Sequence, residues 1–194
     1  MKMNRRLFTL LTAATLASLP VLSRAQDDTP GTTNAESDTN APPTLKESMA
    51  VTNQVTNTVG IVLVKISPNL WAGKYEVTQD PYQKVMGSNP SAFPGDNNPV
   101  DSVNWNDAMA FCKKLTDQEQ TANQLPKGYH YSLPTQQEWE RLVGDASLTD
   151  AVTSLNLQRR TSTAAVGSLG ANSLGLYDTR GNVMEWCLDP QDKP

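Results

Sequence analysis

A change in composition divides the chain near residue 59. The stretch Gln26–Ser48 has no aromatic residue and a single leucine, and it is otherwise rich in Thr, Asn, Asp, Ser and Pro. Such a segment cannot bury enough apolar surface to offset the entropy lost on ordering. From Val59 onward the sequence carries β-branched runs and all four tryptophans. We therefore expect a disordered spacer over residues 26–58 and one folded domain over residues 59–194.

Residues 1–25 are typical of an export signal. Basic residues come first, the apolar stretch Leu7–Leu22 follows, and Ser23-Arg24-Ala25 places small residues where a signal peptidase cuts. The apolar stretch is shorter than the roughly 20 residues that span a bilayer, so no membrane span is expected after cleavage. The sequence thus predicts an exported protein, periplasmic or secreted. Arg5-Arg6 also fits the twin-arginine route of export.

Charge and histidine content exclude several classes of function. The chain has 16 Lys and Arg against 20 Asp and Glu, a net charge of −4. Because a nucleic-acid surface needs clustered positive charge, we expect no nucleic-acid partner. His130 is the single histidine, which excludes metal sites built from several imidazoles.

The expected elements of the folded part are short. They are strands at Val59–Ile66, Leu70–Val77, Tyr129–Leu133 and Val183–Leu188, and helices from Thr78 to Gly87, from Asn104 to about Gln120 and from Thr135 onward. The middle helix has a capping pair, Asn104 and Asp107, and an apolar stripe of Trp105, Ala108, Met109, Cys112 and Leu115. Thr135 and Glu138 form a second capping box. Such short elements between loops rich in Gly, Pro and Asn predict an α+β domain.

Several motifs, in order, resemble those of the formylglycine-generating enzyme, or sulfatase-modifying factor, family. They are Gly73-Lys74-Tyr75-Glu76-Val77-Thr78, Asn98-Pro99-Val100-Asp101-Ser102-Val103-Asn104-Trp105, Leu133-Pro134-Thr135-Gln136-Gln137-Glu138-Trp139-Glu140, Gly175-Leu176-Tyr177-Asp178 and Gly181-Asn182-Val183-Met184-Glu185-Trp186. The resemblance implies an irregular fold related to C-type lectins. It also implies kinship both with non-enzymatic proteins and with enzymes that oxidise a sulfatase cysteine to formylglycine, using oxygen, a copper(I)-binding cysteine pair and a structural calcium.

The departures from the family pattern concern the catalytic part. In the enzymes the cysteine pair follows an Arg-Gly-Gly-Ser-Trp segment and precedes a closing Gly-Phe-Arg, whereas this chain stops at Pro194 with none of these features. We therefore expect a C-terminally truncated fold with no catalytic residue. Copper is not expected, because copper(I) requires soft thiolate ligands and Cys112 and Cys187 align with structural positions.

One metal site of the family survives in part. The resemblance implies calcium held by the side chains of Asp178 and Glu185 and by the backbone carbonyls of Gly181 and Val183. Calcium accepts such a mixture of carboxylate and carbonyl oxygens. The alternative is that Asp178 caps a turn while Glu185 pairs with Arg180.

Other chemistry-bearing residues have structural interpretations. Cys112 and Cys187 either form one disulfide or remain buried thiols. Core packing is the expected role of Trp105, Trp139 and Trp186, and the role of Trp71 stays open. His130 is expected as a strand residue and Glu138 as a helix cap.

Two functions follow from these observations. The first is an exported family member without oxidase activity, which binds a glycan or a protein partner, such as a sulfatase or an envelope component, or serves assembly in the envelope. The second is a fragment of a formylglycine-generating oxidase, whose cysteine pair lies beyond the given sequence.

Overall fold

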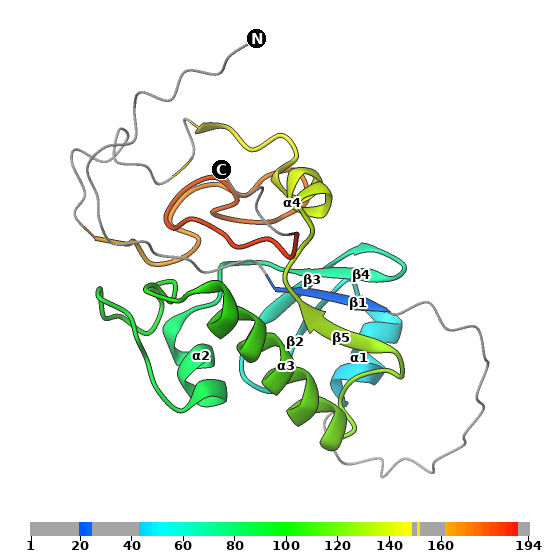
Figure 1. The fold of residues 1–194 in the computed structure, drawn as a ribbon. Helices are drawn as coiled ribbons and strands as arrows, with labels where there is room; N and C mark the ends of the chain where they lie inside the picture. The colour runs from blue at the N-terminus through cyan, green and yellow to red at the C-terminus, as the bar shows by residue number, and fades with distance from the viewer. Residues whose placement is uncertain (1–19, 25–42, 149–150, 152–161, 190–194) are drawn as a thin grey trace.

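The computed structural model describes residues 20–24, 43–148, 151 and 162–189. Its strands are β1 (Val21–Arg24), β2 (Gln54–Thr56), β3 (Val62–Ser67), β4 (Leu70–Gly73) and β5 (Tyr129–Ser132). Its helices are α1 (Leu45–Val51), α2 (Gln79–Met86), α3 (Trp105–Thr121) and α4 (Gln136–Val143). This mixture of helices with one antiparallel sheet agrees with the expected α+β class (Figure 1).

The five strands form one sheet in the order β2-β3-β4-β1-β5, and every neighbouring pair is antiparallel. The hairpin of β3 and β4 turns through Pro68 and Asn69, as the sequence predicts. Strand β4 ends at Gly73 instead of Val77. The chain leaves the sheet there because Glu76 bonds to Asn182 and Val183, far along the sequence.

Strand β1 lies inside the segment that the sequence assigns to the export signal. It pairs with β4 on one side and with β5 on the other, and its residues Val21 and Leu22 are fully buried. Leu22 belongs to the main core cluster together with Trp71 and Tyr131, whereas Val21 joins a second cluster with Leu142. Adjacent strand residues point to opposite faces, so this apolar pair indicates a sheet that is covered on both faces.

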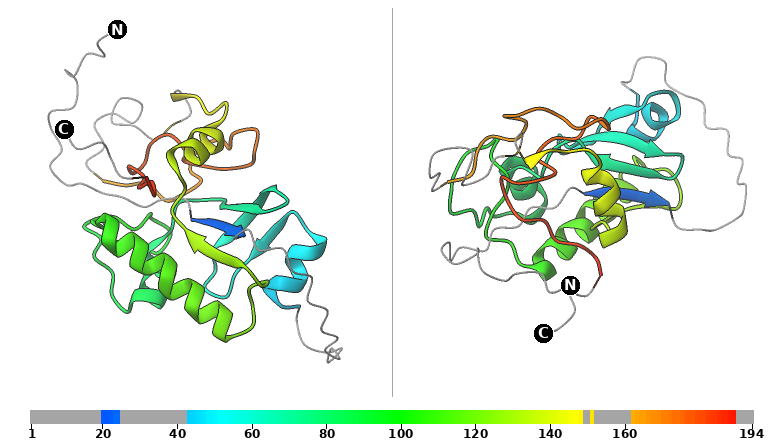
Figure 2. Two further views of the ribbon diagram at one scale, coloured as in Figure 1. Left: turned by 45° about the vertical axis from the view of Figure 1, so that its right-hand side comes forward. Right: turned by 90° about the horizontal axis from the view of Figure 1, so that it is seen from above.

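Figures 1 and 2 show these two covering layers. Helices α2 and α3 lie on one side of the sheet, and α4 with the C-terminal loops lies on the other. Phe111, Cys112 and Leu115 on α3 pack into the main cluster, and Tyr82 of α2 stacks on Phe111 with ring centroids 5.4 Å apart. No helix in the described part of the chain is long and apolar enough to cross a membrane.

The predicted spacer over residues 26–58 is wrong in its last part. Thr44 caps α1 in a capping box with Glu47, and Leu45 and Met49 are buried one helical turn apart. Strand β2 follows and buries Val55. Leu45, Met49 and Val55 face the core while Val51 is exposed, so the average composition of this stretch concealed an amphipathic element. Residues 25–42 lie outside the described residues.

The capping residues in the sequence correctly predict where the helices begin. Helix α3 begins after Asn104 with the expected capping box, and α4 begins after Thr135 in the same way. Helix α2 ends at Gly87, whose φ of 84° suits glycine. The residues between Gly87 and Val103 form neither helix nor strand, as predicted. The expected strand Val183–Leu188 is wrong, because these residues bond to side chains and loops instead of a sheet.

Candidate functional site

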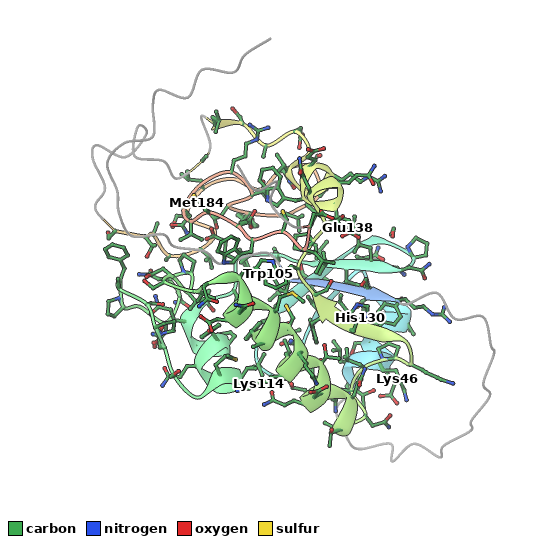
Figure 3. The ribbon with its side chains drawn as sticks, in the orientation of Figure 1. Lys46, Trp105, Lys114, His130, Glu138 and Met184 are labelled. Atoms are coloured by element: carbon green, nitrogen blue, oxygen red, sulfur yellow. The ribbon has the colours of Figure 1, made fainter. Side chains whose placement is uncertain are left out.

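Three tryptophans hold residues 183–189, which we call the tryptophan-held segment, against the starts of α3 and α4. The indole N–H of Trp105 donates to the Cys187 carbonyl at 2.9 Å, and that of Trp139 donates to the Glu185 carboxylate. The indole N–H of Trp186 donates to the Val103 carbonyl at 3.1 Å. Figure 3 shows Trp105 at the start of α3 and Met184 on the adjoining loop. The segment is thus fixed by side chains distant in sequence.

The tryptophans differ in burial: Trp186 packs against the main core cluster, as expected, whereas Trp105 is exposed. Trp71 is 1% exposed in the core, whereas Trp105 is 36% exposed, and Trp139 and Trp186 are half-buried. An indole with an apolar body and one polar N–H suits a position at the edge of a packed surface. Trp105 is the first residue of α3 and the first residue of the predicted apolar stripe. The predicted core role is therefore wrong for Trp105.

Two exposed apolar side chains belong to the tryptophan-held segment itself. Met184 is 61% exposed and Leu188 is 37% exposed. Together with Trp105, Trp139 and Trp186 they form what we call the apolar surface. Its rigidity comes from the indole hydrogen bonds and from Leu188 N–H, which donates to the Pro134 carbonyl at 2.8 Å. Sequence reasoning found the tryptophans but missed their exposure.

A buried carboxylate lies beside the residues for which calcium is expected. Glu76 is buried and accepts from Val183 N–H at 3.1 Å and from the Asn182 amide at 2.8 Å. Burial, and then the carboxylates of Asp178 and Glu185, hold the pKa of Glu76 well above its usual range. The motif containing Glu76 was noted, but its contact with the Gly181-Asn182 turn depends on the fold.

The expected calcium residues are close to this carboxylate but have other hydrogen-bond partners. Asp178 accepts from Gly167 N–H at 2.6 Å, and Glu185 accepts from Trp139. Within the described residues no three His, Cys, Asp or Glu side chains form a group able to hold a metal ion. The expected set has only two such side chains, with two backbone carbonyls. Its oxygen-rich chemistry suits calcium and no softer metal.

A polar cleft of about 190 Å³ opens beside Asp178. Its lining includes Asp145, Asn172, Asp178 and Arg180. The Asp145 carboxylate accepts from the backbone and hydroxyl of Ser173, both at 2.9 Å. Asp145 and Asp178 thus each hold a loop residue beside the cleft, Ser173 and Gly167 respectively.

The two cysteines lie in different surroundings. Both are free thiols, and Cys112 is buried in the main core cluster on α3. Burial raises the pKa of Cys112 to about 12. Burial and the carboxylates of Glu185, Asp189 and Glu140 raise the pKa of Cys187. The thiolate is the metal ligand and the nucleophile, so the raised pKa values lower the reactive fraction of both thiols.

We expect the two thiols to differ sharply in reactivity. At pH 8 a maleimide should label Cys187 in the native protein and leave Cys112 unlabelled, because a pKa of about 12 gives roughly a thousandfold smaller thiolate fraction than an ordinary thiol of pKa about 8.5. Mass spectrometry of labelled peptides measures this difference. Labelling in denaturant, where both should react, is the control. Equal native labelling would contradict the burial of Cys112.

The remaining predicted residues have structural roles. Glu138 accepts from Thr135 N–H at 2.8 Å and completes the cap of α4, as expected. His130 lies in β5, and its Nε2 is 3.5 Å from the Ser23 hydroxyl of β1. Figure 3 places Glu138 on α4, away from His130 on the sheet. No acid–base pair forms between them.

The fold and site define an α+β domain whose C-terminal loop is fixed by tryptophan hydrogen bonds. Residues 48–193 match the Sulfatase-modifying factor enzyme 1-like domain, FGE-sulfatase. The chain belongs to this family, as its motifs indicate. A relative, "Chaperone protein LppX" of Paenibacillus barcinonensis, is 30% identical over 65% of this chain and 64% of its own length. The chain thus spans less than two thirds of that relative. No solved structure matches the chain.

Proposed function

We propose that this chain is an exported family member without oxidase activity, which binds a partner protein in the periplasm or outside the cell. The observation that carries this proposal is the apolar surface, where Met184 and Leu188 are exposed beside three fixed tryptophans. Aromatic residues and methionine are enriched in protein interfaces. A rigid surface also loses little entropy on binding.

Two further observations support a binding role. The chain offers two cysteines, one in the core and both with raised pKa values. The relative named a chaperone is consistent with a protein partner, such as a sulfatase or an envelope component. Export is supported by the basic and apolar residues at the start of the sequence, including the Arg5-Arg6 pair. We assign the domain to the irregular, C-type-lectin-like class on its motifs.

An aggregation assay tests the binding role. We expect the full chain, at equimolar ratio, to lower the light scattering of a heat-denatured reference protein. The Met184→Ser, Leu188→Ser double variant should lose at least about half of this effect, since it removes apolar contact area and leaves the indole hydrogen bonds intact. Val51→Ser is the matched control, because Val51 is 82% exposed on α1, outside the apolar surface.

The oxidase hypothesis predicts a different result. A sulfatase-derived peptide with one cysteine, incubated with the chain, copper(I) and oxygen, should keep its thiol if our proposal holds. Formation of an aldehyde on the peptide, trapped by a hydroxylamine probe, would contradict the proposal and support the oxidase. Equal suppression of aggregation by the double variant would exclude the apolar surface as the binding site.

We also propose calcium at Asp178, Gly181, Val183 and Glu185, as the resemblance implies. Support comes from the carboxylates of Asp178 and Glu185, which both raise the pKa of Glu76, because a divalent cation would offset the repulsion among the three groups.

At ten times its Kd, calcium should add about 1.4 kcal/mol to the free energy of unfolding. Thermal unfolding with and without a chelator measures this. Asp178→Asn should remove most of the gain, and Asp145→Asn, in the adjacent cleft, should keep it. An unchanged midpoint would refute the site.

A further inference from the structure

Strand β1 joins two parts of the sheet that do not otherwise pair. Strands β4 and β5 each bond to β1, and in the described part of the chain they do not bond to each other. Figure 1 shows β1 between them. With β1 removed, β4 and β5 would face each other with unpaired N–H and C=O groups. Such edges are templates for another extended segment.

The residues around the gap between β4 and β5 determine which side chains can occupy each position of a strand bound there. Leu22 lies opposite Trp71 on one side and Tyr131 on the other, and it contributes to the main cluster. Val21 faces the opposite layer, in the cluster that includes Ala72 and Leu142. Ser23 is half-buried and Arg24 is exposed. The gap therefore selects two apolar residues, then a small one, and tolerates a charge at the fourth position.

The ends of the gap also fit the backbone of this segment. Gly73 N–H donates to the Pro20 carbonyl at 2.8 Å, and Arg24 N–H donates to the Asn69 carbonyl at 3.3 Å. A Cβ on Gly73 would lie 2.6 Å from Cδ of Pro20, so only glycine allows this approach. Residues 20–24 are therefore held along their whole length.

This strand is not placed by its connection to a neighbouring strand. Its partners β4 and β5 begin at Leu70 and Tyr129, and the next described residue after Arg24 is residue 43. No tight turn links β1 to either partner. The contacts that hold it would be the same for an untethered segment of the same sequence.

We propose that the gap between β4 and β5 is a strand-acceptor site, which binds an extended peptide by antiparallel pairing on both sides and is filled by residues 20–24 of this chain. Its ligand class is a short peptide with the pattern Pro-apolar-apolar-small. Ser23 and Arg24, the first two residues of the expected cleavage motif, end β1. A protease needs an extended, accessible substrate, so seating of the strand and cleavage there exclude each other. This proposal does not rest on the proposed function.

A nicked form of the full chain tests the site. A specific protease sequence is inserted between Asn34 and Ala35, and the folded protein is cut and passed over a gel-filtration column without denaturant. We expect the fragment that carries residues 1–34 to coelute with the remainder. A labelled peptide of residues 19–25 in excess should then replace the fragment, as measured by fluorescence anisotropy.

Peptide variants supply the controls. Leu22→Asp in the peptide should weaken binding at least about tenfold, because a buried carboxylate pays several kcal/mol and 1.4 kcal/mol is tenfold. Arg24→Gln should bind within about twofold of the original peptide, since Arg24 is exposed. Equal binding of the Leu22→Asp peptide would show nonspecific apolar association and overturn the proposal.

The fate of the cut protein decides the remaining outcomes. Release of the fragment, with the unfolding midpoint of the remainder unchanged, would show that β1 is dispensable. Release with loss of cooperative unfolding would show that β1 stabilises the fold only while tethered. Either result would overturn the strand-acceptor site. Neither depends on the apolar surface, so failure here leaves the binding proposal separately testable.

Discussion

Replacing Trp71 with alanine should lower the free energy of unfolding by about 3–5 kcal/mol, the usual cost of removing a buried large aromatic side chain. Trp71 on β4 is 1% exposed, lies opposite Leu22 of the neighbouring strand β1 and belongs to the main core cluster. The cavity left by alanine would adjoin β1 in the middle of the sheet. Urea unfolding, followed by far-UV circular dichroism, measures the change.

Trp105→Ala is the matched control for this variant. Trp105 is 36% exposed and loses chiefly one hydrogen bond and part of its apolar contact, so we expect a loss of about 1–2 kcal/mol. The sequence pattern alone predicts a core position for Trp105 and leaves the position of Trp71 open. An equal loss for the two variants, or a larger one for Trp105→Ala, would contradict the packing described above.

The second large effect is expected at Glu119, a fully buried carboxylate on α3. Its Oε2 accepts from the Tyr131 hydroxyl at 2.7 Å, and its Oε1 accepts from the backbone N–H and hydroxyl of Thr58 at 3.0 and 2.8 Å. Asn57 donates to the same tyrosine oxygen at 3.0 Å. The network ties α3 and β5 to the loop between β2 and β3, three segments distant in sequence.

Glu119→Ala should cost about 3–5 kcal/mol of unfolding free energy. The substitution leaves three donors without their acceptor, and one of them, the Tyr131 hydroxyl, is buried, where an unsatisfied group costs about 1–3 kcal/mol. Burial, and the nearby carboxylate of Glu119, raise the pKa of Tyr131 well above its ordinary value, so its hydroxyl stays protonated and donates.

The control for Glu119→Ala is Asp117→Ala on the same helix. Asp117 forms an exposed ion pair with Lys113 at 2.6 Å, and such pairs contribute about 0–1 kcal/mol. Chemical unfolding of both variants under the same conditions distinguishes the effect of losing a buried carboxylate from the effect of losing a negative charge alone. A loss at Glu119 as small as that at Asp117 would mean that the network does not stabilise the fold.

Much of the candidate site was visible in the sequence, but its arrangement was not. The motif around Gly181 and Asn182 pointed to Asp178 and Glu185, whereas the buried Glu76 beside them lies about 100 positions earlier in the chain. The tryptophans were identified, but their hydrogen bonds to residues 183–189 were not. An indole N–H finds its acceptor only when distant segments meet, and no local pattern encodes that meeting.

The sequence by itself determined the family, the α+β class and the starts of α3 and α4. Capping boxes such as Asn104 with Asp107 act within four residues, so local sequence is sufficient for them. Only the tertiary structure decided that residues 20–24 and 44–56 join the sheet and its covering layer. These segments have few apolar residues, and what orders them is burial of Leu22, Leu45 and Val55 against a core assembled from the rest of the chain.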